Sequence, residues 1–423
     1  MKLRDRCRAI ATIADGIKAQ GMFPYFRPVG KSWGTEVEVA GKRLVMIGSN
    51  DYLGLSHDPR VKDASAQAVY RWGTGPGGSR FLSGNMELHQ ALEERLAAFV
   101  GKKKAVVHVT GFSANLGALK CLIGGDDLVV YDKESHASII EGVLASKAKM
   151  VSFSHNDATH ASKRVENHGK KTDGDIFLIT EGVFSMSGDI CNLAELVKIK
   201  EQQPDLIFYL DDAHGLGVLG DRGQGTAVHF GVVDKVDFIM GTFSKAMASI
   251  GGFIASDDIE VLEYIRHQSR TQIFSAALPA GNTAAVLACL DVLEVEPDRV
   301  ARLHAVTDKM RRGYKDIGLR ITESNSPIIP ITIGPDDVAF AFSQALFDEG
   351  IFALPAIYPA VPRGEALIRT AYMSTHTDRQ LDYVLDVLDK LSRKFRVRIG
   401  DGVYEAEAAK SDSENGKGRQ SYL

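Results

Sequence analysis

Apolar and polar residues follow helical spacing in some segments of this chain and strand spacing in others. From residue 47 to about residue 292, short apolar runs of strand length alternate with amphipathic segments of helix length, such as residues 88–99, which Gly101 closes. Near the N-terminus, a β-like stretch at residues 35–39 follows apolar residues at helical spacing, namely Leu3, Cys7, Ile10, Ile13 and Ile17. Alternating strands and helices predict an α/β fold with a mostly parallel sheet covered by helices.

The predicted elements divide the chain into four regions. Residues 1–47 form an N-terminal arm, and residues 48–292 form the large α/β domain. Residues 293–398 alternate between helix and strand patterns and predict a smaller α+β domain. Residues 399–423 are rich in Asp, Glu, Ser and Lys and nearly devoid of apolar residues, which predicts a disordered tail.

Composition narrows the classes of protein further. A chain of 423 residues with 44% hydrophobic content can build two cores. The formal net charge of −4 and the pI near 6.3 argue against a general nucleic-acid binder. The four cysteines lack metal-site spacing, which predicts no metal and reduced thiols in a cytoplasmic protein. No apolar run reaches the length of a membrane span, and the charged start does not resemble a signal peptide.

Two predicted strand ends carry reactive side chains. The apolar run 238–240 is followed by Gly-Thr-Phe-Ser and Lys245, and the run 206–210 ends in Asp211, with His214 three residues further on. Taken singly, Lys245 could be a solvated loop lysine and Asp211 a helix N-cap. Together they suit pyridoxal phosphate (PLP), because a lysine can form a Schiff base with its aldehyde and a carboxylate can keep its ring nitrogen protonated.

Three further turns follow predicted strands. Gly111 and Phe112 stand between the strand 105–109 and a helical segment, an arrangement typical of an anion site, although an ordinary turn has the same pattern. His136 follows the strand 127–130 and could stack on a cofactor ring or be structural. Ser185 lies in the turn after the strand at residues 176–179.

These segments resemble a known family. His136, residues 181–186 (EGVFSM), 211–214 (DDAH) and 241–245 (GTFSK) are similar, in order and spacing, to the signature of the α-oxoamine synthases. The resemblance extends from about residue 21 to about residue 391. It implies the PLP-dependent transferase fold of the aspartate aminotransferase type, with a large domain and a smaller C-terminal domain. It also implies condensation of an amino acid with an acyl thioester and loss of carbon dioxide.

The resemblance also implies a role for each candidate residue. Lys245 holds PLP and moves the Cα proton, Asp211 pairs with the ring nitrogen, His214 hydrogen-bonds the phenolic oxygen and His136 stacks over the ring. Further cofactor contacts are implied for Gly111, Phe112, Ser185, Thr242, Ser244 and Ser275. Ser275 is expected to reach the phosphate from the other subunit of a homodimer.

Substrate contacts are implied at two positions. Asn50 resembles a substrate-side residue, and Arg369 resembles the arginine that binds the amino-acid carboxylate, for which a planar guanidinium is suited. A strand-edge arginine in a surface ion pair is the alternative for Arg369. The apolar stripe of the N-terminal helix indicates either an interface with the partner subunit or burial within its own chain.

Among the branches of the family, residues 23–27, 241–256 and 326–330 most resemble the small soluble bacterial serine palmitoyltransferases. That branch implies condensation of L-serine with palmitoyl-CoA to 3-ketodihydrosphingosine, CoA and CO2, the first step of sphingolipid synthesis. Ala360 stands where the biotin-pathway synthase usually has threonine, and Ile357 where some serine palmitoyltransferases have a second arginine. Peripheral contact with the inner membrane stays open.

Other functions also stay open at this point. Within the family they are 8-amino-7-oxononanoate synthase, 2-amino-3-ketobutyrate CoA ligase and a cysteate acyltransferase for sulfonolipids. A PLP-dependent aminotransferase shares the fold and the lysine. A catalytically inactive subunit is disfavoured, because such subunits lack the lysine that Lys245 supplies here.

Overall fold

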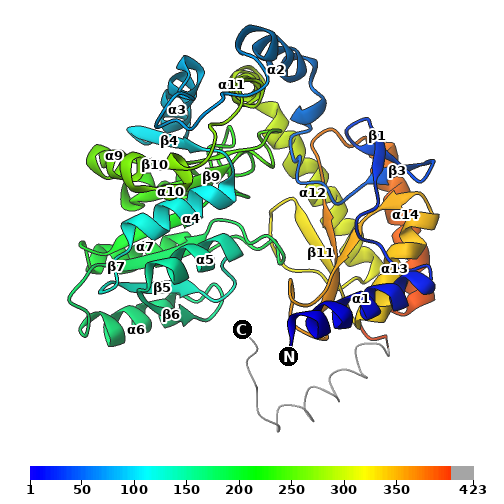
Figure 1. Cartoon of the computed structure of the whole chain (residues 1–423). Helices are drawn as coiled ribbons and strands as arrows, with labels where there is room; N and C mark the ends of the chain where they lie inside the picture. The colour runs from blue at the N-terminus through cyan, green and yellow to red at the C-terminus, as the bar shows by residue number, and fades with distance from the viewer. Residues whose placement is uncertain (402–423) are drawn as a thin grey trace. The chain divides into compact units, whose positions relative to one another are not determined.

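The computed structural model describes residues 1–401, which divide into two compact units (Figure 1). The large unit comprises residues 50–305 and 324–327, and the small unit comprises residues 1–49, 306–323 and the described residues from 328 onward. Of the predicted tail at residues 399–423, the part from residue 402 onward lies outside the described residues.

Within the described residues, the large unit is built on a seven-stranded sheet in the order β4-β10-β9-β8-β7-β5-β6. Strand β10 is antiparallel to both neighbours, whereas the other paired strands are parallel. This confirms the mostly parallel sheet that the sequence predicts. The strands are β4 (Lys104–His108), β5 (Leu128–Asp132), β6 (Lys149–Phe153), β7 (Ile176–Glu181), β8 (Ile207–Asp211), β9 (Phe238–Thr242) and β10 (Gly252–Ser256).

Helices cover this sheet, and a buried apolar cluster joins strands β4, β5, β7, β8, β9 and β10 to helices α4, α5 and α9 (Figure 1). Strands with buried residues on both faces read as continuous apolar runs, which is why these strands were recognisable in the sequence. The helices of the large unit are η1 (Leu55–His57), α2 (Pro59–Trp72), α3 (Glu87–Val100), α4 (Gly111–Leu122), α5 (Ala137–Ser146), α6 (Ala158–Gly169), α7 (Leu193–Gln202), α8 (Thr226–His229), η2 (Val233–Lys235), α9 (Ile259–Gln268), α10 (Arg270–Ile273) and α11 (Ala280–Val295). Helix α12 (Asp298–Ile317) begins in the large unit and ends in the small unit.

The small unit contains two sheets, with strand orders β1-β2-β3-β12 and β11-β14-β13. Their strands are β1 (Val29–Ser32), β2 (Glu36–Val39), β3 (Lys42–Met46), β11 (Ile328–Gly334), β12 (Ile351–Phe352), β13 (Leu354–Ala356) and β14 (Ala366–Ala371). The helices that belong wholly to this unit are α1 (Leu3–Ala19), α13 (Asp336–Asp348) and α14 (Asp378–Phe395).

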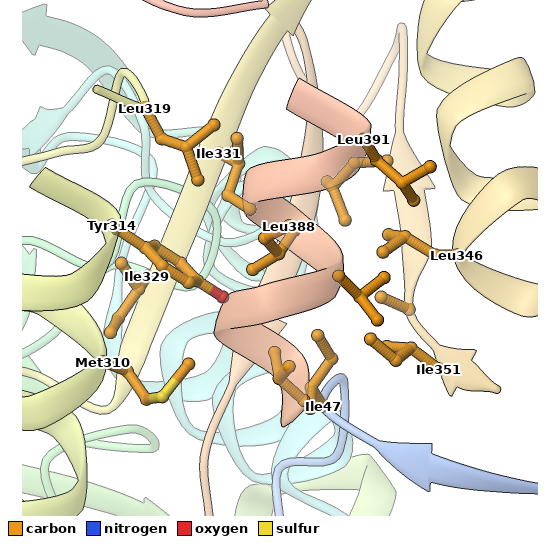
Figure 2. Close-up of a cluster of buried hydrophobic side chains, with 14 of the residues drawn as sticks. Ile47, Met310, Tyr314, Leu319, Ile329, Ile331, Leu346, Ile351, Leu388 and Leu391 are labelled. Carbon is orange, nitrogen blue, oxygen red and sulfur yellow. The ribbon is translucent and has the colours of Figure 1, made fainter. Parts of the chain in front are cut away.

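Helix α14 supplies the centre of the small unit's core. A capping box between Thr377 and Gln380 fixes its first turn, and its apolar residues recur at helical spacing. Figure 2 shows Leu388 and Leu391 of α14 among side chains of α12, α13 and β11, and all of these are nearly inaccessible to water. The burial of these apolar side chains stabilises the small unit through the hydrophobic effect.

The division into units differs from the predicted boundaries in two places. The N-terminal 49 residues group with the small unit, because β3 pairs in parallel with β12 at Val45 and Ile351. Residues 293–305 group with the large unit, because α11 continues to Val295 and α12 starts there. Pairing between strands so distant in the chain leaves no periodic signal, so the sequence pattern could not show it.

The N-terminal helix is confirmed as α1, but the described residues bury none of its side chains. The described residues 1–401 therefore do not cover its apolar stripe, and contact with a partner subunit stays a prediction. In the part of the chain that the structure describes, every helix is too short or too polar to traverse a lipid bilayer.

Candidate active site

Parallel strands bring several predicted residues to one edge of the large-unit sheet. Strands β5, β7, β8 and β9 end there in Asp132, Glu181, Asp211 and Thr242. Glu181 is in register with Asp211, and Asp211 with Met240. Carboxyl ends of parallel strands are where open α/β sheets bind ligands.

Asp211 is held by two hydrogen bonds and is 3% exposed. Its Oδ2 accepts from Asn115 Nδ2 at 2.7 Å, and its Oδ1 accepts from the Ala213 amide at 3.0 Å. Asn115 lies on α4, where its Oδ1 accepts from the Tyr209 hydroxyl at 2.7 Å. A carboxylate has about four acceptor positions, so Asp211 can also take a ring N–H.

The second carboxylate of the motif, Asp212, points elsewhere. Its two oxygens accept from the amide of Thr226 at 2.6 Å and from the hydroxyl of Thr226 at 2.5 Å. Burial raises its pKa to about 6 although these hydrogen bonds oppose the change. Because side chains alternate along a strand, Asp211 projects on the same face as Tyr209, towards α4, and Asp212 does not.

His136 and Glu181 are joined at the same edge. The His136 amide donates to Glu181 Oε1 at 2.6 Å, and the ring of His136 lies 6.3 Å from that of Phe112, centroid to centroid. Burial lowers the pKa of His136; the Asp211 carboxylate opposes this change and the Lys245 ammonium adds to it. Burial also raises the pKa of Glu181 well above its ordinary value, and Asp211 raises it further. Lys245 acts electrostatically on both groups, so its half-buried amine belongs to this cluster.

His214 belongs to a second group on the large unit. Its Nδ1 lies 2.6 Å from the hydroxyl of Tyr52, which is fully buried. The same hydroxyl lies 3.3 Å from Asn50 Oδ1. The structure therefore brings the predicted residues His214 and Asn50 together through a tyrosine that the sequence analysis missed.

The first turn of α4 has the features of an anion site. Thr110 caps this helix and accepts from the Ser113 amide, whereas the amides at Gly111 and Phe112 precede the first hydrogen bond of the helix. A Cβ on Gly111 would stand 2.7 Å from Thr242 Oγ1, so glycine is required for this close approach. Thr242 Oγ1 in turn lies 3.3 Å from the hydroxyl of Ser244.

For three predicted residues, none of the contacts described so far leads to these groups. Ser185 is half-buried in the loop after β7, and Ser275 is half-buried after α10. Arg369 belongs to the small unit, on β14, where it pairs with Pro330 and Leu354. Their functional roles stay predictions.

The donors at this edge fit PLP. A buried carboxylate, an amine, a histidine ring and a helix N-terminus are the groups that the cofactor's ring nitrogen, aldehyde, ring face and phosphate require. All four belong to the large unit and follow strands β4, β5, β8 and β9 of one sheet. Besides Tyr52, sequence reasoning missed Asn115, whose contact with Asp211 has no local sequence signal.

Comparison with known proteins gives the family. The model for aminotransferase class I and II matches residues 42–388. A serine palmitoyltransferase of Sphingobacterium spiritivorum is 41% identical over 384 residues, which cover 91% of this chain and 94% of that protein. An 8-amino-7-oxononanoate synthase of Geotalea daltonii is 37% identical over 385 residues, covering 90% and 97% respectively.

A solved structure agrees with this similarity. The serine palmitoyltransferase of S. paucimobilis, solved with bound PLP and myriocin, matches with a TM-score of 0.90 at 30% identity. The match covers 93% of this chain and 99% of that one, which confirms the expected transferase fold. The chain belongs to the PLP-dependent α-oxoamine synthases, within aminotransferase class I and II.

Proposed function

We propose that this enzyme condenses L-serine with a long-chain acyl-CoA, such as palmitoyl-CoA, to give 3-ketodihydrosphingosine, CoA and CO2. The observation that carries this proposal is the order of similarity: 41% identity to a serine palmitoyltransferase against 37% to an 8-amino-7-oxononanoate synthase, at nearly equal coverage. Ala360, where the biotin-pathway synthase usually has threonine, supports the same branch.

In this proposal the carboxyl edge of the sheet holds the cofactor. The Lys245 amine would bind its aldehyde carbon, the Asp211 carboxylate would accept a hydrogen bond from its ring nitrogen and the His136 ring would cover one face. Gly111, Phe112, Thr242 and Ser244 surround its phosphate, and Ser185 and His214 contact its ring edge. When bound, PLP supplies an electron sink for the negative charge that develops at the substrate's Cα.

The remaining steps fall to side chains of the chain itself. Once the serine amine had taken its place on the cofactor aldehyde, the freed Lys245 amine would remove the Cα proton and later return one; it lies close enough to His136 to act on it electrostatically. Arg369 binds the serine carboxylate through its planar guanidinium, and Asn50 contacts the substrate. The Tyr52 hydroxyl, 2.6 Å from His214 Nδ1, fixes the orientation of that imidazole.

We also propose that the enzyme works as a homodimer in which Ser275 completes the phosphate site of the partner subunit. The unburied apolar stripe of α1 supports a partner for the small unit. Light scattering after size-exclusion chromatography should give a mass near 92 kDa, about twice the 46.0 kDa of the chain. A monomer with full activity would contradict this part of the proposal.

The main experiment is a side-by-side product analysis by mass spectrometry. L-serine, glycine, L-alanine and L-cysteate are each paired with palmitoyl-, pimeloyl-, acetyl- and succinyl-CoA. The pair L-serine and palmitoyl-CoA should give the highest kcat/KM, and activity should rise with acyl chain length because each buried methylene stabilises binding by about 0.8 kcal/mol. Higher activity with L-alanine and pimeloyl-CoA would assign the enzyme to the 8-amino-7-oxononanoate branch, which its 37% identity makes the second candidate.

Substitution of Arg369 tests the substrate side. Arg369→Ala should raise the KM for L-serine far more than the KM for palmitoyl-CoA, because the guanidinium partners the carboxylate of the amino acid. Arg369→Lys should recover only part of the loss, since an ammonium cannot bind a carboxylate through two parallel hydrogen bonds. Equal changes in the two KM values would contradict the assignment of Arg369 to the serine carboxylate.

A further inference from the structure

One histidine in the large unit lies between two carboxylates from different segments, one at a strand end and one in a loop. His155 follows β6, and its Nδ1 lies 3.0 Å from Asp132 Oδ1 at the end of β5. Its Nε2 lies 3.0 Å from Asp189 Oδ2, in the loop after β7, and 3.7 Å from Glu134 Oε2. Asp132 is fully buried and the side chain of His155 is 19% exposed.

With both carboxylates ionised, this geometry requires a charged imidazole. An ionised carboxylate only accepts hydrogen bonds, so both ring nitrogens of His155 must donate, and an imidazole with two N–H groups is a cation. Burial alone lowers the pKa of His155, but hydrogen bonds to Asp132 and Asp189 outweigh it and raise that pKa to about 10. In return, His155 holds the pKa of Asp189 below its ordinary value against the effect of burial.

Asn156, next to His155 in the chain, also joins Asp132 to Asp189. Its amide donates to Asp132 Oδ2 at 2.7 Å, and its Nδ2 donates to Asp189 Oδ2 at 2.9 Å. Its Oδ1 accepts from the Asn192 amide at 2.7 Å, beyond the far end of the loop. Asn156 has a positive φ of 54°, a backbone conformation that asparagine tolerates better than most residues.

The two loops held in this way carry proposed active-site residues. Asp132 is followed by the turn that ends in His136, whose amide donates to Glu181 at 2.6 Å. Asp189 closes the loop that carries Ser185, and Phe184 of that loop meets the His155 ring edge-on at 4.3 Å between centroids. Displacement of His155 would therefore loosen both loops at once, with Asn156 left to join Asp132 to Asp189.

We infer that His155 is a positioning residue: as a cation it joins the loop of residues 133–136 to the loop of residues 182–190 and so sets His136 and Ser185 in place. The inference rests on the proposed function only for the roles of His136 and Ser185. The ion pairs and the geometry of the two loops do not depend on which amino acid or acyl donor is used.

The charge state is measured in the unmodified enzyme, and a variant is needed only to assign the signal. Histidine-labelled holoenzyme is followed by NMR from pH 6 to pH 9, and the His155 signal is assigned by its loss in His155→Gln. Both ring nitrogens should keep the chemical shifts of N–H groups throughout this range. A His155 that loses a proton below pH 8 would overturn the inference whatever the substrate proves to be.

The positioning role is tested with His155→Gln and a matched control, His160→Gln. His160 lies in the same segment, and its Nδ1 accepts from the Ser154 amide at 3.1 Å instead of facing two carboxylates. Hydrogen exchange of enzyme without PLP should speed up at residues 133–136 and 182–190 in His155→Gln alone. The kcat/KM for the amino acid should fall by up to about 100-fold in this variant, with the KM for the acyl donor unchanged.

A double variant separates the loss of the cation from a general loss of packing. In His155→Gln/Asp189→Asn, a glutamine amide can donate to Asp132 while its oxygen accepts from the new asparagine. This neutral pair should slow exchange in both loops again and recover part of the activity. Exchange that stays at wild-type rates in His155→Gln, or an equal loss in His160→Gln, would refute the positioning role.

Discussion

Replacement of Asp211 by asparagine removes one negative charge from the sheet edge with little change in side-chain size. In the enzyme, its two oxygens accept from Asn115 Nδ2 at 2.7 Å and from the Ala213 amide at 3.0 Å. An asparagine has one oxygen and one NH2 group, so one of these two donors loses its acceptor. A buried donor left unpaired costs about 1–3 kcal/mol, and we expect the free energy of unfolding to fall by that amount.

The effect on catalysis should be larger than the effect on stability. Without the carboxylate, nothing at this position favours a proton on the ring nitrogen, and charge at the substrate's Cα is stabilised less. Loss of one preorganised electrostatic contact typically costs roughly 3–4 kcal/mol of transition-state stabilisation, or a fall in kcat of about 100-fold to 1000-fold. Exchange of the Cα hydrogen of L-serine in D2O, without acyl donor, should slow to the same degree.

The neighbouring Asp212 provides the control for this experiment. It is equally buried, but both of its oxygens are bound by Thr226. Asp212→Asn should lower the free energy of unfolding by a similar amount, measured by urea titration, yet reduce Cα exchange by less than about 10-fold. Equal losses of exchange in the two variants, or wild-type exchange in Asp211→Asn, would refute the assignment of Asp211 to the ring nitrogen.

Four further substitutions have expected outcomes. Borohydride should fix PLP on Lys245, and Lys245→Ala should lose turnover; a variant that works at the wild-type rate would remove this lysine from the chemistry. Tyr52→Phe removes the hydroxyl 2.6 Å from His214 Nδ1 and should lower kcat about 5-fold, with kcat unchanged if the contact is only structural. Glu181→Gln should change kcat by less than about 3-fold, because burial raises the pKa of Glu181 and so disfavours its charge, and a glutamine oxygen can still accept from the His136 amide; a large loss would show that the charge is needed. Burial lowers the pKa of His376 from 6.5 to about 4, so only the unfolded chain binds a proton between these values. Stability should therefore fall by about 3 kcal/mol as the pH decreases from 6.5 to 4, and urea titrations of His376→Asn should show a shallower fall.

The elements of the large unit could be predicted because their signal is local. Strands β5, β7, β8 and β9 are apolar runs that end in polar residues, and α3 has helical periodicity closed by Gly101. The side chains that hold the catalytic groups have no such signal. Asn115 lies inside a helix and meets Asp211 across 96 positions of the chain, and Tyr52 meets His214 across 162.

His155 is a further residue whose role the sequence alone does not show. Its two carboxylate partners lie 23 positions before it and 34 positions after it, so its pattern in the sequence is that of an ordinary loop histidine. Asp211 and Asp212 are adjacent in the sequence, and only the register of β8 decides which of the two carboxylates faces α4. The chemistry was therefore predictable at the strand ends, whereas the groups that orient it required the fold.

The buried acids at this edge explain why such groups are needed. Bringing several carboxylates out of water is costly unless each one is compensated. Asp132 is compensated by the His155 cation, Asp212 by both donors of Thr226, and Glu181 by a raised pKa that disfavours its charge. Asp211 is held by Asn115 and the Ala213 amide, two neutral donors. Among these four acids, Asp211 is therefore the one suited to meet the protonated ring nitrogen of the cofactor, and its neighbours keep competing charges away from it.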